Sequence, residues 1–197
     1  MISPHGQNIV VYDLEIKNPI QGDVTWGRHD LMEISVGVAF HYLTSEYLIF
    51  MDDNIEELPK LLNQADIVSG FNILSFDNRL LEACVREKYH NHQNAYDLLI
   101  ESRLASGWAF NQPFPRQMRL DDHLECTFGQ DYKKTQDGAE APHMWHRKEL
   151  GKLISYCIAD VKRECMLFEH VWNELPVRTP QHPERILRHP LRARKNK

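Results

Sequence analysis

The sequence predicts a mixed α/β domain in which helices pack on a central sheet. Three β-rich segments come first, at residues 8–16, 33–42 and 46–51, and the connections between them carry no helical pattern. Helical and strand-like segments follow, and a long segment of helical period begins near Arg147 and ends before Pro176. This order is typical of a layered fold in which helices cover a sheet.

The remaining elements follow from hydrophobic spacing and turn-forming residues. Asn54 precedes an apolar pattern of helical period and is expected to cap the helix that follows. Apolar residues every three or four positions between Leu150 and Val171 predict the last helix. The other predicted elements are helices at 54–64, 77–88 and 120–128, a helical turn at 100–105, strands at 67–71 and 95–98, and loops at 17–30, 107–119 and 129–142.

The composition is typical of one soluble globular domain. The chain has 197 residues, of which 42% are hydrophobic, and this is enough to bury a core without disulfides or structural zinc. Its four cysteines form no CxxC pair and no zinc-like spacing, which fits a reducing compartment. The sequence has no signal-peptide core and no apolar run of membrane length, so we expect a cytoplasmic protein without a membrane partner.

Charge is distributed unevenly along the chain. Residues 177–197 contain seven Lys or Arg and one acid, Glu184, so they carry +6, and residues 1–176 carry −11 of the net −5. We therefore predict one domain over residues 1–176 and a basic C-terminal tail over 177–197. The tail could contact phosphates, or it could be a solvated terminus. Bound cations would reduce the negative charge of residues 1–176, which would otherwise repel nucleic acid.

Two acids interrupt the first apolar strand. Asp13 and Glu15 flank Leu14, so on a strand both side chains point to one face, about 7 Å apart. Acidic side chains are seldom buried without a counter-charge. The pair therefore indicates either an edge strand with a solvated face or half of a divalent-metal site.

Three further residues suit such a site, and two of them have simpler explanations. Asp77 begins a predicted helix, where it could be an N-cap. Tyr156 and Asp160 are four positions apart, so they are neighbours on one helix face, close to the apolar stripe. Asp160 could instead form a salt bridge with Lys152 or Arg163.

The order of these residues resembles the DEDD superfamily of 3′→5′ exonucleases. The shared features are Asp-x-Glu on a strand, Asn-x-x-x-Phe-Asp before a helix and Tyr-x-x-x-Asp in a late helix, over about residues 8–173. Tyr-Cys-Ile-Ala-Asp at 156–160 is similar to the third motif of the tyrosine subgroup, as in the proofreading domain of family B DNA polymerases. Residues 133–145 are similar to stand-alone predicted exonucleases related to that domain. The resemblance implies a ribonuclease H-like fold with a mixed five-stranded sheet.

The resemblance also implies two Mg²⁺ or Mn²⁺ ions, which prefer oxygen ligands. Such ions, about 3.5–4 Å apart, activate a water and stabilise charge on phosphorus. Asp13 would bridge both ions and Asp77 would hold one of them. Glu15 and Asp160 would hold the ion that activates water. Tyr156 would orient this water, because a phenol with a pKa of about 10 is a poor base near neutrality. The implied nucleic-acid contacts are Leu14, Asn72, Phe76, Lys133 and Lys134.

Other candidates have ordinary structural explanations. Asp97 is expected to cap a helix, and Glu164 is expected to be solvated. Four histidines are expected at the surface, namely His90, His92, His143 and His146. Some aromatic residues could stack on bases, although core or loop packing also explains them: Trp26, Trp108, Phe110 and Phe128.

The predicted activity is metal-dependent release of nucleoside monophosphates from the 3′ end of single-stranded DNA. The polarity follows from the resemblance alone. RNA is the alternative substrate, because the same fold and motifs serve ribonucleases. A non-catalytic nucleic-acid-binding module, a metallophosphatase and a nucleotide pyrophosphatase are further alternatives, and a missing acidic ligand would favour the binding module.

Overall fold

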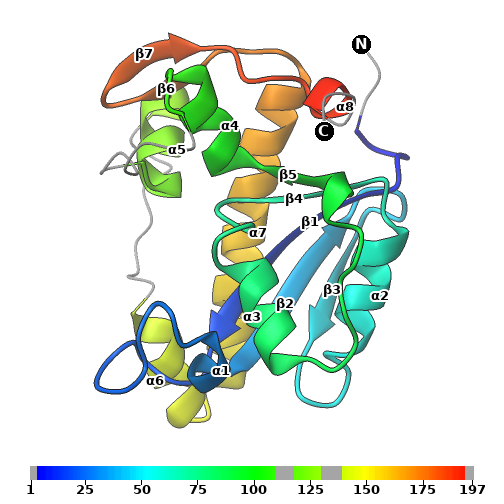
Figure 1. Ribbon diagram of the computed structural model, residues 1–197, viewed down its shortest axis with the longest axis vertical. Helices are drawn as coiled ribbons and strands as arrows, with labels where there is room; N and C mark the ends of the chain where they lie inside the picture. The colour runs from blue at the N-terminus through cyan, green and yellow to red at the C-terminus, as the bar shows by residue number, and fades with distance from the viewer. Residues whose placement is uncertain (1–3, 110–117, 130–138, 194–197) are drawn as a thin grey trace.

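A mixed five-stranded sheet is the centre of the computed structural model, which describes residues 4–109, 118–129 and 139–193 (Figure 1). The strand order is β3-β2-β1-β4-β5, with antiparallel pairing on the β2 side of β1 and parallel pairing on its β4 side. The predicted mixed five-stranded sheet is confirmed. The strands are β1 (Ile9–Ile16), β2 (Ile34–His41), β3 (Glu46–Phe50), β4 (Ile67–Gly70) and β5 (Ala95–Asp97).

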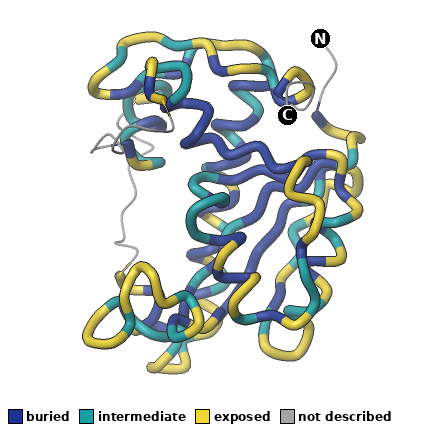
Figure 2. The backbone as a smooth tube through the Cα atoms, viewed as in Figure 1, coloured by how far each residue is buried: buried dark blue, intermediate teal, exposed yellow. Residues whose placement is uncertain are grey.

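Helices cover both faces of this sheet. The odd-numbered side chains Ile9 and Val11 of β1 pack with α7 (Leu150–Trp172), which passes behind the sheet in Figure 1. The even-numbered side chains Val10, Tyr12 and Leu14 pack with α2 (Glu57–Gln64) and α3 (Asp77–Cys84) on the opposite face. The period-2 alternation of the strand therefore divides its side chains between two cores. Figure 2 shows that β1, β2, β4 and β5 are mostly buried, whereas the edge strand β3 is mostly half-buried or exposed.

The strands β1 and β4 separate halfway along β1. Their parallel pairing covers only Ile9 to Val11, opposite Ile67 to Ser69. β4 ends at Gly70, and the chain then turns at Asn72, whose φ of +71° lies in the left-handed region. The β4-side edge of β1 is therefore open from Tyr12 onward, and α3 reaches this edge.

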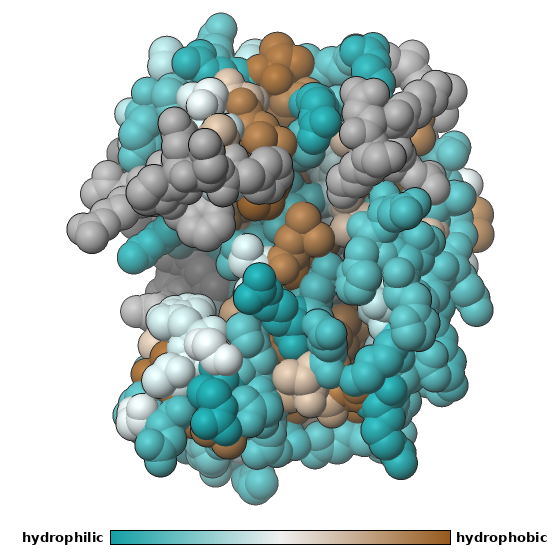
Figure 3. Space-filling model, viewed as in Figure 1, coloured by the Kyte–Doolittle hydropathy of each residue, from teal (hydrophilic) through white to brown (hydrophobic). Residues whose placement is uncertain are grey.

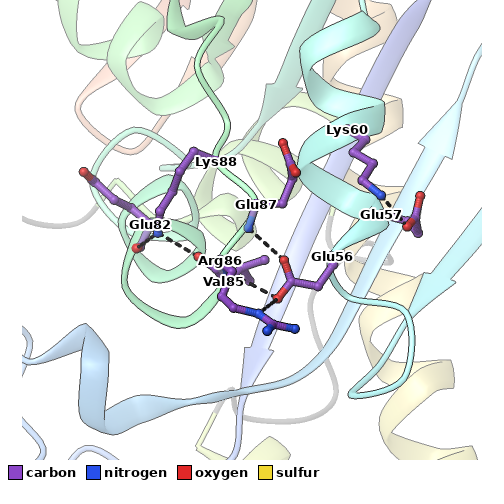
Figure 4. Close-up of polar contacts among 8 residues, drawn as sticks. All are labelled: Glu56, Glu57, Lys60, Glu82, Val85, Arg86, Glu87 and Lys88. Atoms are coloured by element: carbon purple, nitrogen blue, oxygen red, sulfur yellow. Dashed lines mark hydrogen bonds and ion pairs between the residues drawn. The ribbon is translucent and has the colours of Figure 1, made fainter.

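α3 ends at Cys84, four residues before the end predicted from the sequence. Val85 is extended, with φ −114° and ψ 139°. The Lys88 ammonium group donates to the carbonyl oxygens of Glu82 and Val85, each at 2.7 Å (Figure 4). A cation at a helix C-terminus satisfies carbonyls that lack a helical partner and complements the helix dipole.

Glu56 joins the segment after α3 to the start of α2. Its carboxylate accepts hydrogen bonds from the backbone N–H of Arg86 at 3.3 Å and of Glu87 at 2.8 Å (Figure 4). The predicted N-cap, Asn54, lies in the turn before α2. Its side chain accepts from the Met51 N–H at 2.7 Å and donates to the Ile49 carbonyl at 3.0 Å, so it closes this turn and does not cap the helix.

Two short helices were not predicted from the sequence. α1 (His29–Met32) begins at the end of the predicted loop 17–30, and α6 (Glu140–His146) begins at the end of the predicted loop 129–142. α1 is too short to show a helical period in the sequence. α6 buries Ala141 and Met144 on the α7 side of the sheet, so tertiary packing stabilises it. The predicted helices near 100 and 120 are α4 (Leu98–Ala105) and α5 (Leu120–Phe128).

The basic C-terminal segment packs on the rest of the chain as far as residue 193. It forms β6 (Val177–Thr179), β7 (His182–Arg185) and α8 (Pro190–Ala193). Val177 and Leu187 are buried in the core on the α7 side. The alternative of a solvated terminus is therefore wrong for residues 177–193, and the domain boundary at residue 176 stays a prediction.

Several basic side chains of this segment have acidic partners within the chain. Arg188 binds the buried carboxylate of Glu101 through two hydrogen bonds, of 2.6 and 2.8 Å. Arg178 pairs with Glu184 at 2.8 Å, and Arg192 pairs with Glu174 at 2.9 Å. These contacts reduce the positive charge that the segment could offer to phosphates.

The surface in the view of Figure 3 is mainly hydrophilic, and its hydrophobic side chains lie in separate groups. Within the described ranges, no helix is both long enough and apolar enough to cross a membrane.

Candidate active site

Asp13 and Glu15 lie on the central strand β1, on the face that α7 covers. Both side chains are half-buried and continue the row of Ile9 and Val11. β1 pairs with β2 along its whole acidic half, and its register shifts between Glu15 and Ile16, so an irregularity lies directly beside the acidic pair. β1 lies between β2 and β4, so it is not an edge strand of the sheet, although β4 does not pair with its acidic half. The shared face predicted from the spacing is confirmed.

Asp77 brings a third carboxylate to the same strand. It is the first residue of α3, and its Oδ1 accepts the backbone N–H of Leu14 at 3.1 Å. This bond satisfies a strand N–H at the open edge of β1. Asp77 is 2% exposed, and burial together with the charge of Asp13 raises the pKa of its carboxyl well above the usual range. The carboxylate thus links α3 to β1 and does not act as the N-cap of α3, which is Phe76.

Asp160 comes from the middle of α7 and is 7% exposed. The Arg163 guanidinium donates to Asp160 Oδ1 at 3.0 Å and also donates to the carboxylate of Asp121 in α5. The predicted salt-bridge alternative is therefore present, with Arg163 as the partner. The exposed Lys152 pairs with Glu149 instead. Arg163 supplies positive charge beside Asp160 and links α7 to α5.

Glu164 lies one turn after Asp160 and is 2% exposed, so the expectation that it is solvated was wrong. Its Oε1 accepts the backbone N–H of Phe71 at 3.0 Å. Burial, and then the charges of Asp13 and Asp77, raise the pKa of this carboxyl well above the usual range. The sequence held a signal for this position, since Tyr156, Asp160 and Glu164 repeat every four residues on one helix face.

A cleft of about 190 Å³ brings residues from β1, α5 and α7 together. Its acidic residues are Asp13, Asp121, Asp160 and Glu164, and its basic residues are Arg119 and Arg163. The lining residues are Asp13, Phe71, Arg119, Leu120, Asp121, Asp160, Arg163 and Glu164. The sequence-predicted site residues Glu15, Asp77 and Tyr156 are not among them.

One group of possible metal ligands lies at the β1 side of this cleft. The group consists of Asp13, Glu15 and Cys157, each of which offers one ligand atom. These three atoms lie within 4.8 Å of one another. The Cys157 thiol donates to Asp13 Oδ2 at 3.6 Å and to the Asp13 carbonyl at 3.5 Å. Burial, together with the charge of Asp13, raises the pKa of this thiol well above its usual range. The thiol is therefore a hydrogen-bond donor here. Its contact with Asp13 was not predicted from the sequence.

The donor set fits a hard divalent cation. Carboxylates from one strand and two helices are close enough for their charges to raise the pKa values of Asp77 and Glu164. A bound Mg²⁺ or Mn²⁺ ion would compensate this repulsion, and both ions favour oxygen ligands. Glu164 Oε2 is buried and has no hydrogen-bond partner among the described residues, so one carboxylate oxygen remains available to a cation or its water.

Tyr156 and the proposed nucleic-acid contacts have varied surroundings. The Tyr156 ring is buried in the core on the α7 side, one turn before Asp160. Leu14 is buried on the opposite face of the sheet. The Asn72 backbone N–H donates to Asp97 at 3.0 Å. Phe76 is partly buried and directly precedes Asp77. Lys133 and Lys134 lie outside the described residues.

The remaining sequence expectations concern Asp97, four histidines and four aromatic residues. Asp97 is confirmed as the N-cap of α4, since it accepts from the N–H groups of Leu99 and Ile100. The four histidines expected at the surface are exposed: His90, His92, His143 and His146.

The aromatic candidates divide into packed and exposed residues. Trp108 is buried, and Phe128 packs against His170 with ring centroids 5.0 Å apart. Trp26 is 70% exposed, and its ring centroid lies 6.0 Å from that of Phe76. Phe110 lies outside the described residues. Trp26 is therefore the exposed aromatic residue that lies beside the motif of Asp77.

Comparison with solved structures relates this architecture to part of a DNA polymerase. No protein-family model and no curated protein matches the sequence. The fold is similar to that of the family B DNA polymerase from the hyperthermophilic archaeon Pyrobaculum calidifontis, with a TM-score of 0.58 and 14% identity. The match covers 83% of this chain and 24% of the polymerase, so the chain spans about a quarter of that protein's length. The strand order and this similarity together show that the chain has a ribonuclease H-like fold.

Proposed function

We propose that this protein is a metal-dependent 3′→5′ exonuclease of the DEDD type, with tyrosine in the third motif, acting on single-stranded DNA. One observation carries the proposal: β1, α3 and α7 bring Asp13, Asp77 and Asp160 to one region of the fold. Asp13 and Asp160 line the same cleft, and Asp77 is bonded to the backbone next to Asp13. A purely structural role would not explain why one fold concentrates so many repelling carboxylates.

The acidic residues have separate tasks in this proposal. Asp13, Glu15, Asp77 and Asp160 would hold two divalent ions, as the resemblance implies. When bound, such ions lower the pKa of water and neutralise charge on the phosphoryl group. Asp77 also keeps β1 in place through Leu14, so a ligand residue and the strand that carries Asp13 are positioned together. Tyr156 would orient the attacking water through its hydroxyl group.

The remaining residues of the cleft suit a phosphodiester substrate. Arg119 and Arg163 line the cleft beside the carboxylates. Arg163 already donates to Asp160 and Asp121, so Arg119 is the residue that could bind phosphate oxygens through two donors. Trp26 presents an exposed ring near the Asp77 motif, and bases stack on such rings without sequence preference. The resemblance of the motifs to proofreading domains favours DNA, and the solved structure with a similar fold is a DNA polymerase.

The direct test uses synthetic oligonucleotides of identical sequence in DNA and RNA. Each is labelled at the 5′ end and incubated with the protein and Mg²⁺ or Mn²⁺. The expected result is a ladder of DNA products that shorten from the 3′ end, with release of nucleoside monophosphates and no reaction in EDTA. A ladder obtained with RNA alone would assign a ribonuclease. Shortening from the 5′ end would contradict the polarity.

An inactive variant separates this activity from a contaminating nuclease. Asp13→Asn has nearly the same shape as the wild type and should give no ladder. Glu57→Gln is a matched control, because Glu57 is exposed on α2 and pairs with Lys60 away from the cleft (Figure 4). Full activity in Asp13→Asn would overturn the proposed site.

A further inference from the structure

Glu164 is the one buried acid of the cleft that lies outside the four-carboxylate pattern. It comes from α7, one turn after Asp160, and lines the cleft together with Asp13 and Asp160. Its Oε1 accepts the Phe71 N–H at 3.0 Å, just after β4 ends at Gly70. The carboxylate is therefore held in place from both sides, by its own helix and by the end of a central strand.

The second oxygen, Oε2, has no hydrogen-bond partner within the described residues. The close packing around Gly70 locates this oxygen. A Cβ atom at Gly70 would lie 3.3 Å from Glu164 Oε2 and 2.7 Å from the Tyr12 carbonyl oxygen. Glu164 thus sits where β1 and β4 separate, next to the backbone that leads into Asp13.

A buried carboxylate oxygen without a hydrogen-bond donor is unfavourable, because it has lost its water without gaining a partner. The nearest cationic side chain in sequence, Arg163, is directed to Asp160 and Asp121. The other groups whose charge acts on Glu164 are Asp13, Asp77 and Asp160, which repel it. A donor or positive charge for Oε2 must therefore come from outside these side chains.

We propose that Glu164 is a fifth acidic residue of the divalent-cation site, whose Oε2 accepts hydrogen bonds from the water shell of the bound cation. This inference rests on the cation site of the proposed function. Mg²⁺ and Mn²⁺ sites commonly retain bound water, and Mg²⁺ usually keeps several water ligands. Because Oε1 is bound to the Phe71 N–H, the carboxylate is oriented before a cation arrives. Loss of comparable outer hydrogen bonds at metal sites reduces affinity by about 10–100-fold.

The test measures Mn²⁺ binding by calorimetric titration, without nucleic acid, so that its readout is independent of activity. Glu164→Gln keeps an oxygen acceptor for the Phe71 N–H but removes the negative charge. We expect it to weaken Mn²⁺ binding by about 10–100-fold. Glu57→Gln removes an equal charge from the exposed surface of α2 and should bind Mn²⁺ like the wild type.

The outcomes separate this inference from the proposed function. If Asp13→Asn loses Mn²⁺ binding while Glu164→Gln keeps wild-type affinity, the cation site stands and the role of Glu164 is refuted. If Glu164→Gln weakens binding but no oligonucleotide is cleaved, the role of Glu164 stands and the nuclease proposal fails. Absence of Mn²⁺ binding to the wild type would refute both.

Near-ultraviolet circular dichroism checks that each variant is folded. If Glu164→Gln does not fold, Glu164→Asp takes its place, since it keeps the charge but withdraws the carboxylate by one methylene. A folded Glu164→Asp variant should also bind Mn²⁺ more weakly than the wild type. Wild-type affinity in that variant would refute the inference.

Discussion

The carboxylate of Asp77 accepts the backbone N–H of Leu14 at 3.1 Å. This one bond joins the first residue of α3 to the central strand, at the edge that β4 leaves open. Asp77 therefore serves the fold and the proposed chemistry together. These two roles can be separated by experiment, because an amide can replace the carboxylate as an acceptor but not as an anionic ligand.

Two substitutions of Asp77 should divide the roles. Asp77→Asn keeps an acceptor for Leu14 and should lose activity with little change in the free energy of unfolding. Asp77→Ala leaves the Leu14 N–H without its acceptor and should lower the free energy of unfolding by a further 1–3 kcal/mol or so. Urea denaturation and the oligonucleotide assay measure the two effects. Equal stability of the two variants would contradict the structural role.

Divalent cations should raise the melting temperature of the wild type. A ligand that binds only the folded state at about 100 times its Kd adds roughly 2.7 kcal/mol of stability. Mg²⁺ or Mn²⁺ should have little effect on Asp13→Asn, which lacks the residue expected to contact both ions. Differential scanning fluorimetry with EDTA as reference measures the shift. An equal shift in both proteins would place the bound cation elsewhere.

Tyr156→Phe should slow the reaction and leave the fold intact. The ring stays in the core on the α7 side, and only the hydroxyl group is removed. Loss of one orienting hydrogen bond should reduce the single-turnover rate by about 10–100-fold, with KM for the oligonucleotide almost unchanged. A complete loss of activity would instead identify Tyr156 as essential to the chemical step. Unchanged rates would remove it from the site.

Arg163→Met should destabilise the metal-free protein more than the metal-bound protein. The substitution removes the cation that Asp160 and Asp121 share, on a side chain that is largely buried. We expect the free energy of unfolding to fall by about 1–3 kcal/mol in EDTA, between the values for exposed and buried pairs. Saturating Mn²⁺ should reduce this difference, because the cation then balances Asp160. Lys152→Met is the control, since Lys152 pairs with Glu149 on the exposed surface.

Trp26→Ala should weaken binding of single-stranded DNA without affecting the fold. The indole is 70% exposed, so its removal takes little from the core. Loss of one base-stacking contact costs about 1–3 kcal/mol, or roughly 5–150-fold in affinity. Fluorescence anisotropy in an Asp13→Asn background avoids cleavage. Leu43→Ala removes another exposed hydrophobic side chain and should have no effect. Identical affinities for both variants would exclude Trp26 from the binding surface.

Local patterns predicted the sheet and much of the acidic site. The alternation along β1 placed Asp13 and Glu15 on one face, and the structure confirms this because a strand always directs alternate side chains to the same side. The four-residue spacing of Tyr156 and Asp160 likewise places both on the buried side of α7. The predictions of helix ends and of short helices were less accurate. α3 ended early because Lys88 and Glu56 bind the backbone there, and these contacts depend on tertiary neighbours.

Patterns along the chain predicted the fold class and the shared face of the acidic pair, because strands and helices repeat their geometry every few residues. The surroundings of the remaining acids depend on tertiary packing, which no local pattern predicts. Asp97 and Glu164 were both expected to lie outside the site. Asp97 does cap α4, whereas Glu164 is buried one turn after Asp160 in α7. Only the way α7 crosses the separating strands β1 and β4 distinguishes them. The four-residue spacing places Glu164 on the same face of α7 as Asp160, but its contact with the Phe71 N–H and the lack of a partner for Oε2 among the described residues depend on tertiary packing.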